Sequence, residues 1–462
     1  MTMHSMTFPT PLTAPRRWRD RLLAVLSVKS LLVAAVMAFG LHAADSAEAA
    51  NRYVRAGAGG NGSGADWSNA YPTLPASLVR GDTYYVASGS YGAYTFRDPQ
   101  SGSLTITVKK ATAADHGTDT GWQAAYGNGQ AVFASVVRFD TGNYVFDGQV
   151  RNEADWFDGG AYGFRINHNG KDQNIVISGG ASSSNITVKH VFVDAIYQNL
   201  PSNTVRRYAI DTDTYGGSIA TKLVFHRMYV YGSNNVWFLR TTEGAVVEYS
   251  ASNGVSSNSA NHGEIVNLYY SGNNAVIRYN QWKNAFAGSG GTALVAITFA
   301  DGLQFYGNVA TNFNVGDGAI GFNGYSSSRN RVYNNTFING TGYNSGTAFG
   351  SGTDNLVYNN LFINNRIVNL EGTHDYNSFS DSNSRGEARA QVNVPTSIFA
   401  DFNGGNYKLL AETSAGMSLP APFNRDLLGA TRGADGTFSR GAYEFVSGSS
   451  TALTPPANLV VR

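Results

Sequence analysis

Val276-Ile277-Arg278-Tyr279-Asn280 is the stretch of sequence that decides the fold. It returns as Gln304-Phe305-Tyr306-Gly307-Asn308, Arg331-Val332-Tyr333-Asn334-Asn335 and Leu356-Val357-Tyr358-Asn359-Asn360. The final asparagines of the four copies lie 28, 27 and 25 residues apart. A period of this length, with an apolar pair followed by a polar turn, predicts one coil of a parallel β-helix for each copy.

The same register extends upstream and predicts an apolar column inside the helix. The inward positions are Val188, Phe225, Val247, Ile277, Phe305, Val332 and Val357. We expect a second strand on each coil, at residues 236–240, 265–270, 294–299, 319–322 and 367–370. Turns rich in Gly, Ser and Asn separate the two sets of strands.

Stacked coils about 4.8 Å apart place identical side chains above one another. Side-chain amides in such a column can hydrogen-bond from coil to coil. We therefore interpret Asn280, Asn308, Asn335 and Asn360 as a structural ladder and not as a binding site.

Alternation along the strand turns the neighbours of the apolar column outward. This outward column contains Lys189, His226, Glu248, Arg278, Tyr306, Tyr333 and Tyr358. We predict that it meets a polysaccharide, because a tyrosine ring offers a sugar a flat apolar face with a polar edge. The alternative is that like residues stack on neighbouring coils without any ligand.

The composition favours strands and tight turns over helices. The 462 residues include 53 Gly and 26 Tyr, and 14% are charged. The absence of Cys excludes a disulfide framework and thiolate metal sites. A formal net charge of +1 provides no general attraction for nucleic acid or for an anionic membrane, so we expect neither partner, and we expect a monomer.

The two ends differ from the repeats. Arginines precede an apolar stretch at residues 31–43 and small residues follow it, which is typical of a secretory signal peptide. The stretch is shorter than the about 18 to 20 residues that cross a bilayer. We expect a signal peptide at 1–50, secretion, a β-helix domain at 51–445, and a linker and tail at 446–462. Residues 455–461 of that tail are similar to the first strand of a fibronectin type III module.

Two flanking segments carry a resemblance to a known group of proteins. Gly81-Asp82-Thr83-Tyr84-Tyr85-Val86 is similar to the first coil of the right-handed parallel β-helix proteins of the pectate-lyase-like superfamily. Asp426-Leu427-Leu428-Gly429, Arg432 and Arg440-Gly441-Ala442-Tyr443-Glu444-Phe445 are similar to their closing signature. The resemblance implies an all-β fold, a right-handed parallel β-helix.

Within that superfamily the sequence resembles the chondroitinase B and alginate lyase family. Glu264-Ile265-Val266-Asn267-Leu268-Tyr269-Tyr270-Ser271 is similar to one family motif, and residues 294–300 to the next. Glu264 matches. Tyr269 or Tyr270 stands where the family has its catalytic Lys, and Thr298 stands about where it has its catalytic Arg. The resemblance implies a lyase that acts on an acidic extracellular polysaccharide, in a chain that lacks the family's basic pair.

Elimination from a uronate needs neutralisation of the carboxylate, a base and a donor to the leaving oxygen. The residues of suitable type on adjoining coils are His262, Glu264, Tyr269, Tyr270, Arg278 and Lys283, which we predict as catalytic. His262 has a second interpretation as a hydrogen-bonded surface residue.

Three alternatives remain open. Asp211 and Asp213 share one face of a strand, as the paired carboxylates of a polygalacturonase-like glycoside hydrolase would. His262 and Glu264, with Glu248 and Glu243, contain ligands that calcium accepts, although no cofactor is certain and the metal ligands stay unknown. A non-catalytic carbohydrate-binding or cell-surface β-helix would explain the missing Lys and Arg.

Overall fold

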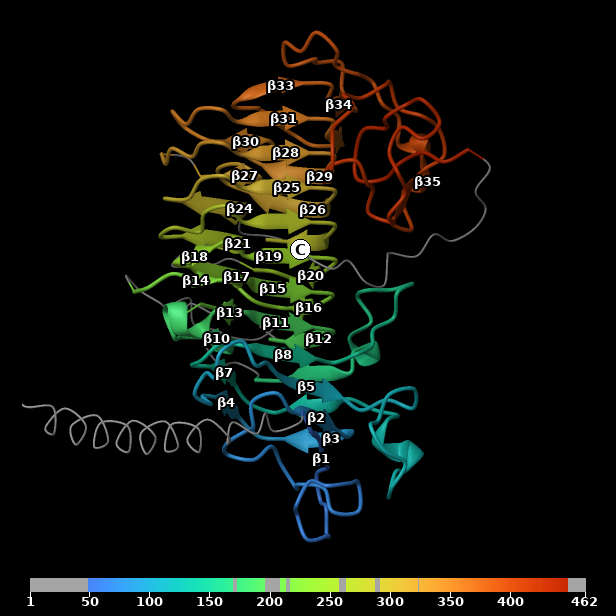
Figure 1. The fold of residues 1–462 in the computed structure, drawn as a ribbon. Helices are drawn as coiled ribbons and strands as arrows, with labels where there is room; N and C mark the ends of the chain where they lie inside the picture. The colour runs from blue at the N-terminus through green and yellow to red at the C-terminus, as the bar shows by residue number, and fades with distance from the viewer. Residues whose placement is uncertain are drawn as a thin grey trace, which may run out of the picture. The chain divides into compact units, whose positions relative to one another are not determined.

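The computed structural model describes residues 49–168, 173–195, 208–212, 217–256, 263–286, 291–322 and 324–447. The chain divides into two units, Met1–Ala49 and Ala50–Arg462. The second unit is a stack of short parallel strands that climb coil by coil (Figure 1). The tail that resembles a fibronectin strand lies outside the described residues.

Each complete coil contributes one strand to each of three parallel sheets, and together the sheets make a right-handed parallel β-helix. Sheet A consists of β1 (Asn51–Val54), β2 (Thr83–Val86), β5 (Ile106–Lys110), β8 (Tyr144–Asp147), β11 (Ile186–Lys189), β15 (Leu223–His226), β19 (Val246–Glu248), β22 (Val276–Arg278), β25 (Gln304–Tyr306), β28 (Arg331–Tyr333), β31 (Leu356–Tyr358) and β33 (Thr373–Asp375).

The other two sheets follow sheet A in chain order. Sheet B consists of β3 (Gly89–Tyr91), β6 (Ala131–Phe133), β9 (Phe164–Ile166), β12 (Val191–Asp194), β16 (Tyr229–Tyr231), β20 (Ala251–Asn253), β23 (Gln281–Ala285), β26 (Val309–Val315), β29 (Thr336–Gly342), β32 (Leu361–Ile363) and β34 (Ser378–Phe379). Sheet C consists of β4 (Tyr94–Phe96), β7 (Val137–Phe139), β10 (Gln173–Ile177), β13 (Tyr208–Asp211), β17 (Asn235–Arg240), β21 (Glu264–Tyr269), β24 (Ala293–Thr298), β27 (Ile320–Gly321) and β30 (Thr347–Ala348).

The remaining regular structure is small. β14 (Ala220–Thr221) pairs with β18 (Thr242–Glu243) in parallel, and β35 (Phe399–Asp401) pairs with β36 (Asn406–Leu409) in antiparallel. In the part of the chain that the structure describes, helix is limited to 3-10 turns at Ala124–Tyr126, Gly159–Ala161, Gly180–Ser183 and Thr396–Ile398.

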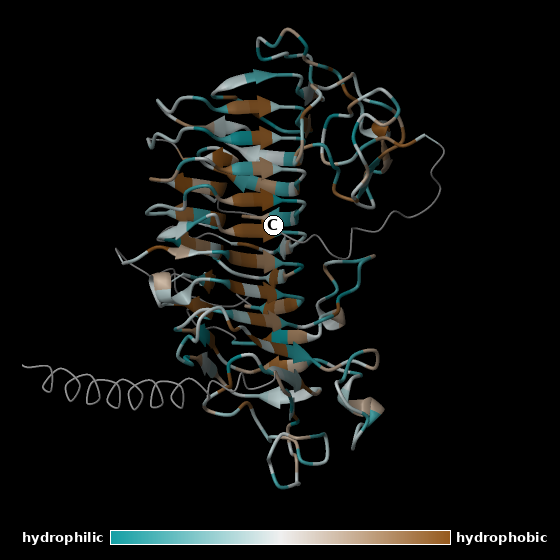
Figure 2. Ribbon diagram, in the orientation of Figure 1, coloured by the Kyte–Doolittle hydropathy of each residue, from teal (hydrophilic) through white to brown (hydrophobic). Residues whose placement is uncertain are grey.

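The predicted apolar column is confirmed, and it lies in sheet A. Its seven members are paired in register from coil to coil, and each is at most 1% exposed. Sheet B adds a column of stacked rings, in which Phe337, Phe362 and Phe379 follow one another at centroid distances of 5.0 and 5.6 Å. Figure 2 shows hydrophobic strands following one another up the stack. Like residues above like residues therefore fill a continuous core.

The prediction of two strands on each coil is wrong, because sheet B supplies a third. From β16 onward only two residues separate its strands from those of sheet A, so the sequence pattern merges the two. The first residue of this turn has a positive φ, as at Tyr279 (φ 57°) and Asn334 (φ 55°), and the chain changes direction there. Residues 367–370 are also not a strand, although the carbonyls of Ile367 and Asn369 accept hydrogen bonds from the coil below.

The asparagine ladder is confirmed at the second residue of the same turn. Asn308 donates from its Nδ2 to the Oδ1 of Asn335 at 3.1 Å, and its backbone N–H donates to the same oxygen at 2.9 Å. The Nδ2 of Asn335 also donates to the Phe305 carbonyl of the core strand, at 3.0 Å. The ladder continues through Asn360 to Asn377, where the Glu387 carboxylate accepts from the last amide at 2.6 Å.

We predict that Asn335→Ala lowers the free energy of unfolding by about 2 to 4 kcal/mol, because it leaves buried donors and acceptors on two coils without partners. Ser351→Ala is the control. It removes one hydrogen bond to Ser326 at the exposed surface, and it should cost about 1 kcal/mol or less. Urea denaturation followed by circular dichroism measures both. Equal losses for the two variants would contradict a special role for the buried ladder.

Candidate functional site

The outward column of sheet A forms as predicted. Lys189 pairs with His226, His226 with Glu248, and Glu248 with Arg278. The column continues from Arg278 through Tyr306 and Tyr333 to Tyr358. Residues about one coil apart in the chain are therefore vertical neighbours on one wall of the β-helix.

The open surface that we expected on this wall is not formed at its centre. Glu248 and Tyr306 are each 1% exposed and Tyr333 is 4% exposed. The chain after the last coil folds back here, and the Phe423 ring contacts the rings of Tyr306 and Tyr333 edge-on, at 4.9 Å from each. The segment that resembles a closing signature packs into the same cluster through Leu427, Ala442 and Tyr443.

A hydrogen-bonded network occupies the buried part of the column. Glu248 accepts from the Arg278 Nε at 2.7 Å, and its other oxygen lies 2.9 Å from the His226 Nδ1. Arg278 also donates to the Tyr306 hydroxyl at 3.0 Å. Burial by itself would raise the pKa of Glu248, but the His226 hydrogen bond and the Arg278 charge lower it below its ordinary value. These groups satisfy one another inside the protein.

Two further predicted residues have local partners on other surfaces. Lys189 lies 3.1 Å from the Asp147 carboxylate on the preceding coil. Lys283 belongs to β23 of sheet B, and its ammonium lies 3.7 Å from the centre of the Phe157 ring. The predicted catalytic residues are therefore divided among the sheets, with Arg278 on A, Lys283 on B, and Glu264 and Tyr269 on C. His262 lies outside the described residues.

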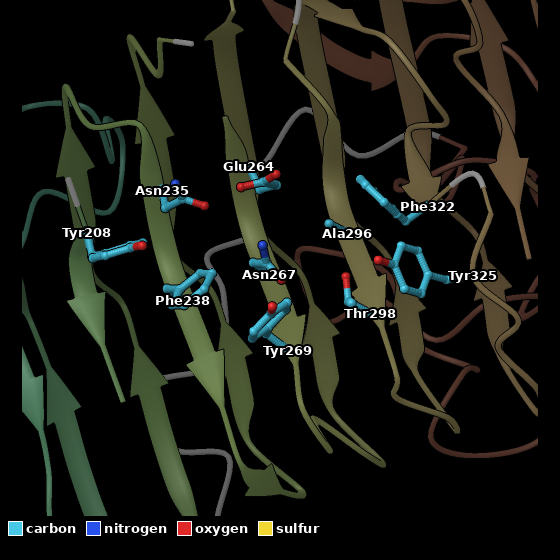
Figure 3. A pocket seen from close by; sticks show the side chains of 10 residues that line it. All are labelled: Tyr208, Asn235, Phe238, Glu264, Asn267, Tyr269, Ala296, Thr298, Phe322 and Tyr325. Carbon is cyan, nitrogen blue, oxygen red and sulfur yellow. The ribbon is translucent and has the colours of Figure 1, made fainter. Parts of the chain in front are cut away.

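A groove of about 190 Å³ lies on the outer face of sheet C (Figure 3). Side chains from successive coils and from the turn after β27 line it: Tyr208, Asn235, Phe238, Glu264, Asn267, Tyr269, Ala296, Thr298, Phe322 and Tyr325. Two of the predicted catalytic residues, Glu264 and Tyr269, are among them. We take this groove as the candidate functional site.

Aromatic rings form both sides of the groove. The Tyr208 and Phe238 rings are stacked at 4.5 Å, and Tyr269 stacks on Phe238 at 5.7 Å. On the other side the Phe322 and Tyr325 rings contact each other at 5.1 Å. Phe238 is buried and the other four rings are half-buried. These rings and the polar groups between them suit a ligand with apolar faces and hydroxyl edges.

Polar side chains run between the aromatic sides. Asn235 pairs in register with Glu264, and Tyr269 pairs with Thr298 on the next coil. Asn267 lies between them on β21, and Figure 3 shows its amide pointing into the groove. Its Oδ1 is buried and has no hydrogen-bond partner in the described part of the chain. A buried acceptor of this kind gains most from a ligand that donates to it.

Sequence reasoning singled out Glu264, Tyr269 and Thr298 but not the other groove residues. Asn235 and Phe238 belong to a strand that the sequence predicts, at residues 236–240, to within one residue. Aligning the outward positions of that strand with those of β21 would have placed Phe238 beside Asn267. Tyr325 comes from a turn, so no strand register could have indicated it.

Asp211, a candidate for hydrolysis, is held in an ion pair. Arg240 donates to it from Nε at 3.1 Å and from Nη2 at 2.9 and 2.7 Å, and the Gln173 amide donates at 2.6 Å. The Arg240 guanidinium lies 4.8 Å from the centre of the Phe238 ring and so supports one side of the groove. Asp213 lies outside the described residues.

The three glutamates that the sequence suggested as calcium ligands do not form a group that could hold a metal ion, and His262 lies outside the described residues. Glu248 belongs to sheet A and Glu264 to sheet C, while Glu243 accepts a hydrogen bond from the Asn274 amide. Among residues 49–447, leaving out the gaps, no three His, Cys, Asp or Glu side chains form a group that could hold a metal ion.

Comparisons with known proteins identify no family. No family model matches the chain, and no curated protein matches it by sequence. Among solved structures, a PL6 family polysaccharide lyase from Pseudopedobacter saltans is 11% identical, over 75% of this chain and 94% of its own, with a TM-score of 0.32. In the described segments we find no helix of the length and apolarity that a membrane crossing requires.

We predict that stability falls as the pH drops below about 6.5, because of two buried histidines, His190 and His226. Burial lowers the pKa of His190 and of His226 from 6.5, and their carboxylate partners offset this only in part. Below pH 6.5 the unfolded chain therefore binds more protons than the folded chain does. The contribution of the two uncharged histidines to stability is complete above pH 6.5 and is lost towards lower pH.

Free energies of unfolding from urea titrations at pH values of about 7.5 and 5.5 test this prediction. His226→Gln should reduce the difference between the two pH values. A stability that rises on acidification would contradict the prediction.

Proposed function

We propose that this protein holds a polysaccharide in the groove on sheet C and cleaves it as a polysaccharide lyase. The observation that carries the proposal is the groove itself, in which stacked aromatic rings flank a row of amide, carboxylate and hydroxyl groups. Aromatic faces bind the apolar faces of sugar rings, and the polar row binds their hydroxyls. The fold does not carry the proposal, because one fold supports many functions.

Tyr269 is the group that we assign to proton transfer. It is half-buried, lines the groove and pairs in register with Thr298. In the elimination, Tyr269 acts as the base in its phenolate form and takes the proton from C5 of a uronate. The C4–O4 bond breaks, a C4–C5 double bond forms, and the Tyr269 hydroxyl returns that proton to the leaving O4 oxygen. The amide groups of Asn235 and Asn267 supply hydrogen-bond donors for the uronate carboxylate.

Binding without cleavage is the second candidate, and a specific observation favours it. None of the ten lining residues is Lys or Arg. A uronate carboxylate would therefore meet no positive side chain among the described groove residues, apart from Arg240 behind Phe238, which is already paired with Asp211. Binding without cleavage requires only the aromatic sides of the groove and no positive side chain.

The setting that we propose is extracellular. The signal peptide expected at residues 1–50 would direct the chain to secretion, where polysaccharides are available. The net charge of +1 gives no reason to expect nucleic acid as a partner. No step of the proposed reaction depends on calcium, which enters only as a variable of the assay.

We expect the purified protein to release unsaturated product from at least one of alginate, chondroitin and pectate, detected by its ultraviolet absorbance, with calcium or with a chelator. Tyr269→Phe should lower kcat by about 100-fold or more, because it removes the titratable oxygen and keeps the ring. Tyr126→Phe, in a 3-10 turn of the first coils, is the matched control and should retain full activity.

The outcome also separates the two candidates. Retention on an immobilised polymer without product from any substrate would leave the binding function and reject the lyase. No retention and no product, with a folded protein, would reject both.

A further inference from the structure

The turn that follows sheet C carries large aromatic side chains at backbone positions that disfavour them. Tyr270 has a φ of 46° and Phe299, at the same place one coil later, has a φ of 60°. Their backbones are hydrogen-bonded through the turn, since Ser271 donates to the Phe299 carbonyl at 3.2 Å. Asn or Gly is the usual residue in this left-handed region, and a bulky side chain there is strained.

Phe299 is exposed to solvent, although it is a large apolar residue. It is 59% exposed, while its neighbours Thr298 and Ala300 are buried. The ring therefore stabilises the fold little. Backbone strain and exposed apolar side chains are both found at ligand-binding positions.

The Phe299 ring continues the aromatic surface of the groove. It stacks on Tyr270 at 5.9 Å with an interplanar angle of 15°, and it meets the Tyr325 ring edge-on at 5.0 Å. Tyr325 lines the groove directly, and Tyr270 contacts the groove residue Tyr269 at 4.2 Å. Two chains of ring contacts thus connect Phe299 with opposite sides of the groove.

We propose that Phe299, supported by Tyr270 and Tyr325, is a second sugar-stacking subsite beside the groove. It stacks on the apolar face of a pyranose ring of the polysaccharide chain that is bound in the groove. The protein therefore binds longer oligosaccharides more tightly than short ones. The inference rests on the proposed function, because it assumes that carbohydrate occupies the groove.

Charge does not determine which sugar this subsite binds, because the three rings are uncharged. Stacking on an aromatic face depends on the axial C–H groups of the sugar, so acidic and neutral pyranoses both meet the requirement. The subsite therefore adds affinity and length preference, while the polar row of the groove selects the sugar.

Affinity electrophoresis through gels that contain alginate, chondroitin, pectate or xylan tests the inference. In whichever gel retards the full chain, Phe299→Ala should weaken retention roughly fivefold. Competition with oligosaccharides of increasing length, made from that polymer, should show the loss for long competitors and not for short ones. Leu410→Ala removes another large exposed side chain, 61% exposed in the C-terminal segment, and should change nothing.

Phe299→Asn separates binding from folding. It should weaken retention as Phe299→Ala does, yet raise the Tm by about 1 to 2 °C, because Asn tolerates the positive φ. A lower Tm for this variant would mean that the ring serves the fold, and would overturn the inference.

The remaining outcomes distinguish this inference from the proposed function. If Tyr269→Ala abolishes retention and Phe299→Ala does not weaken it, binding in the groove is supported and the second subsite is rejected. If neither variant changes the retention of the full chain, both hypotheses are rejected. If no gel retards the full chain, the proposed function fails and this inference fails with it.

Discussion

The buried column of asparagines between sheets A and B fixes the vertical register of the upper coils. From Asn308 upward, each amide oxygen accepts from the backbone and the amide of the asparagine on the coil below, as that of Asn335 does from Asn308. The amide nitrogen of Asn335 donates both to Asn360 and to a core carbonyl. Every one of these bonds requires the coils to stack without slipping by a residue. Because an unpaired buried amide is costly, the ladder excludes other registers.

The columns on the outer faces inherit this register. Glu248 meets Arg278 on sheet A, and Tyr269 meets Thr298 on sheet C, because the coils that carry them are already aligned. The three-strand coil then decides which residues share a surface. Lys283 follows Arg278 by five residues and still faces a different direction, since a left-handed turn at Tyr279 separates their strands.

The two polar surfaces of the molecule differ in how far their groups are satisfied. On sheet A, Glu248 is bound by His226 and Arg278, and the returning C-terminal segment covers Tyr306 and Tyr333 of the same column. On sheet C, the Asn267 Oδ1 has no partner in the described chain, and Phe299 exposes its ring to solvent. Groups that already pair within the protein have little to offer a ligand. For this reason we place the proposed binding surface on sheet C and regard the sheet A network as structural.

The sequence by itself determined the coil period, the core column from Val188 to Val357, the asparagine ladder and the outward column, because each depends only on which residue recurs at a fixed step. It also directed attention to Glu264 and Tyr269, through a resemblance. Only the tertiary structure decided which outward column is open. The chain that covers Tyr306 through Phe423 lies more than a hundred residues away in sequence, and Tyr325 reaches the groove from a turn. Periodicity describes neighbours on adjacent coils, and it carries no information about segments that fold back across them.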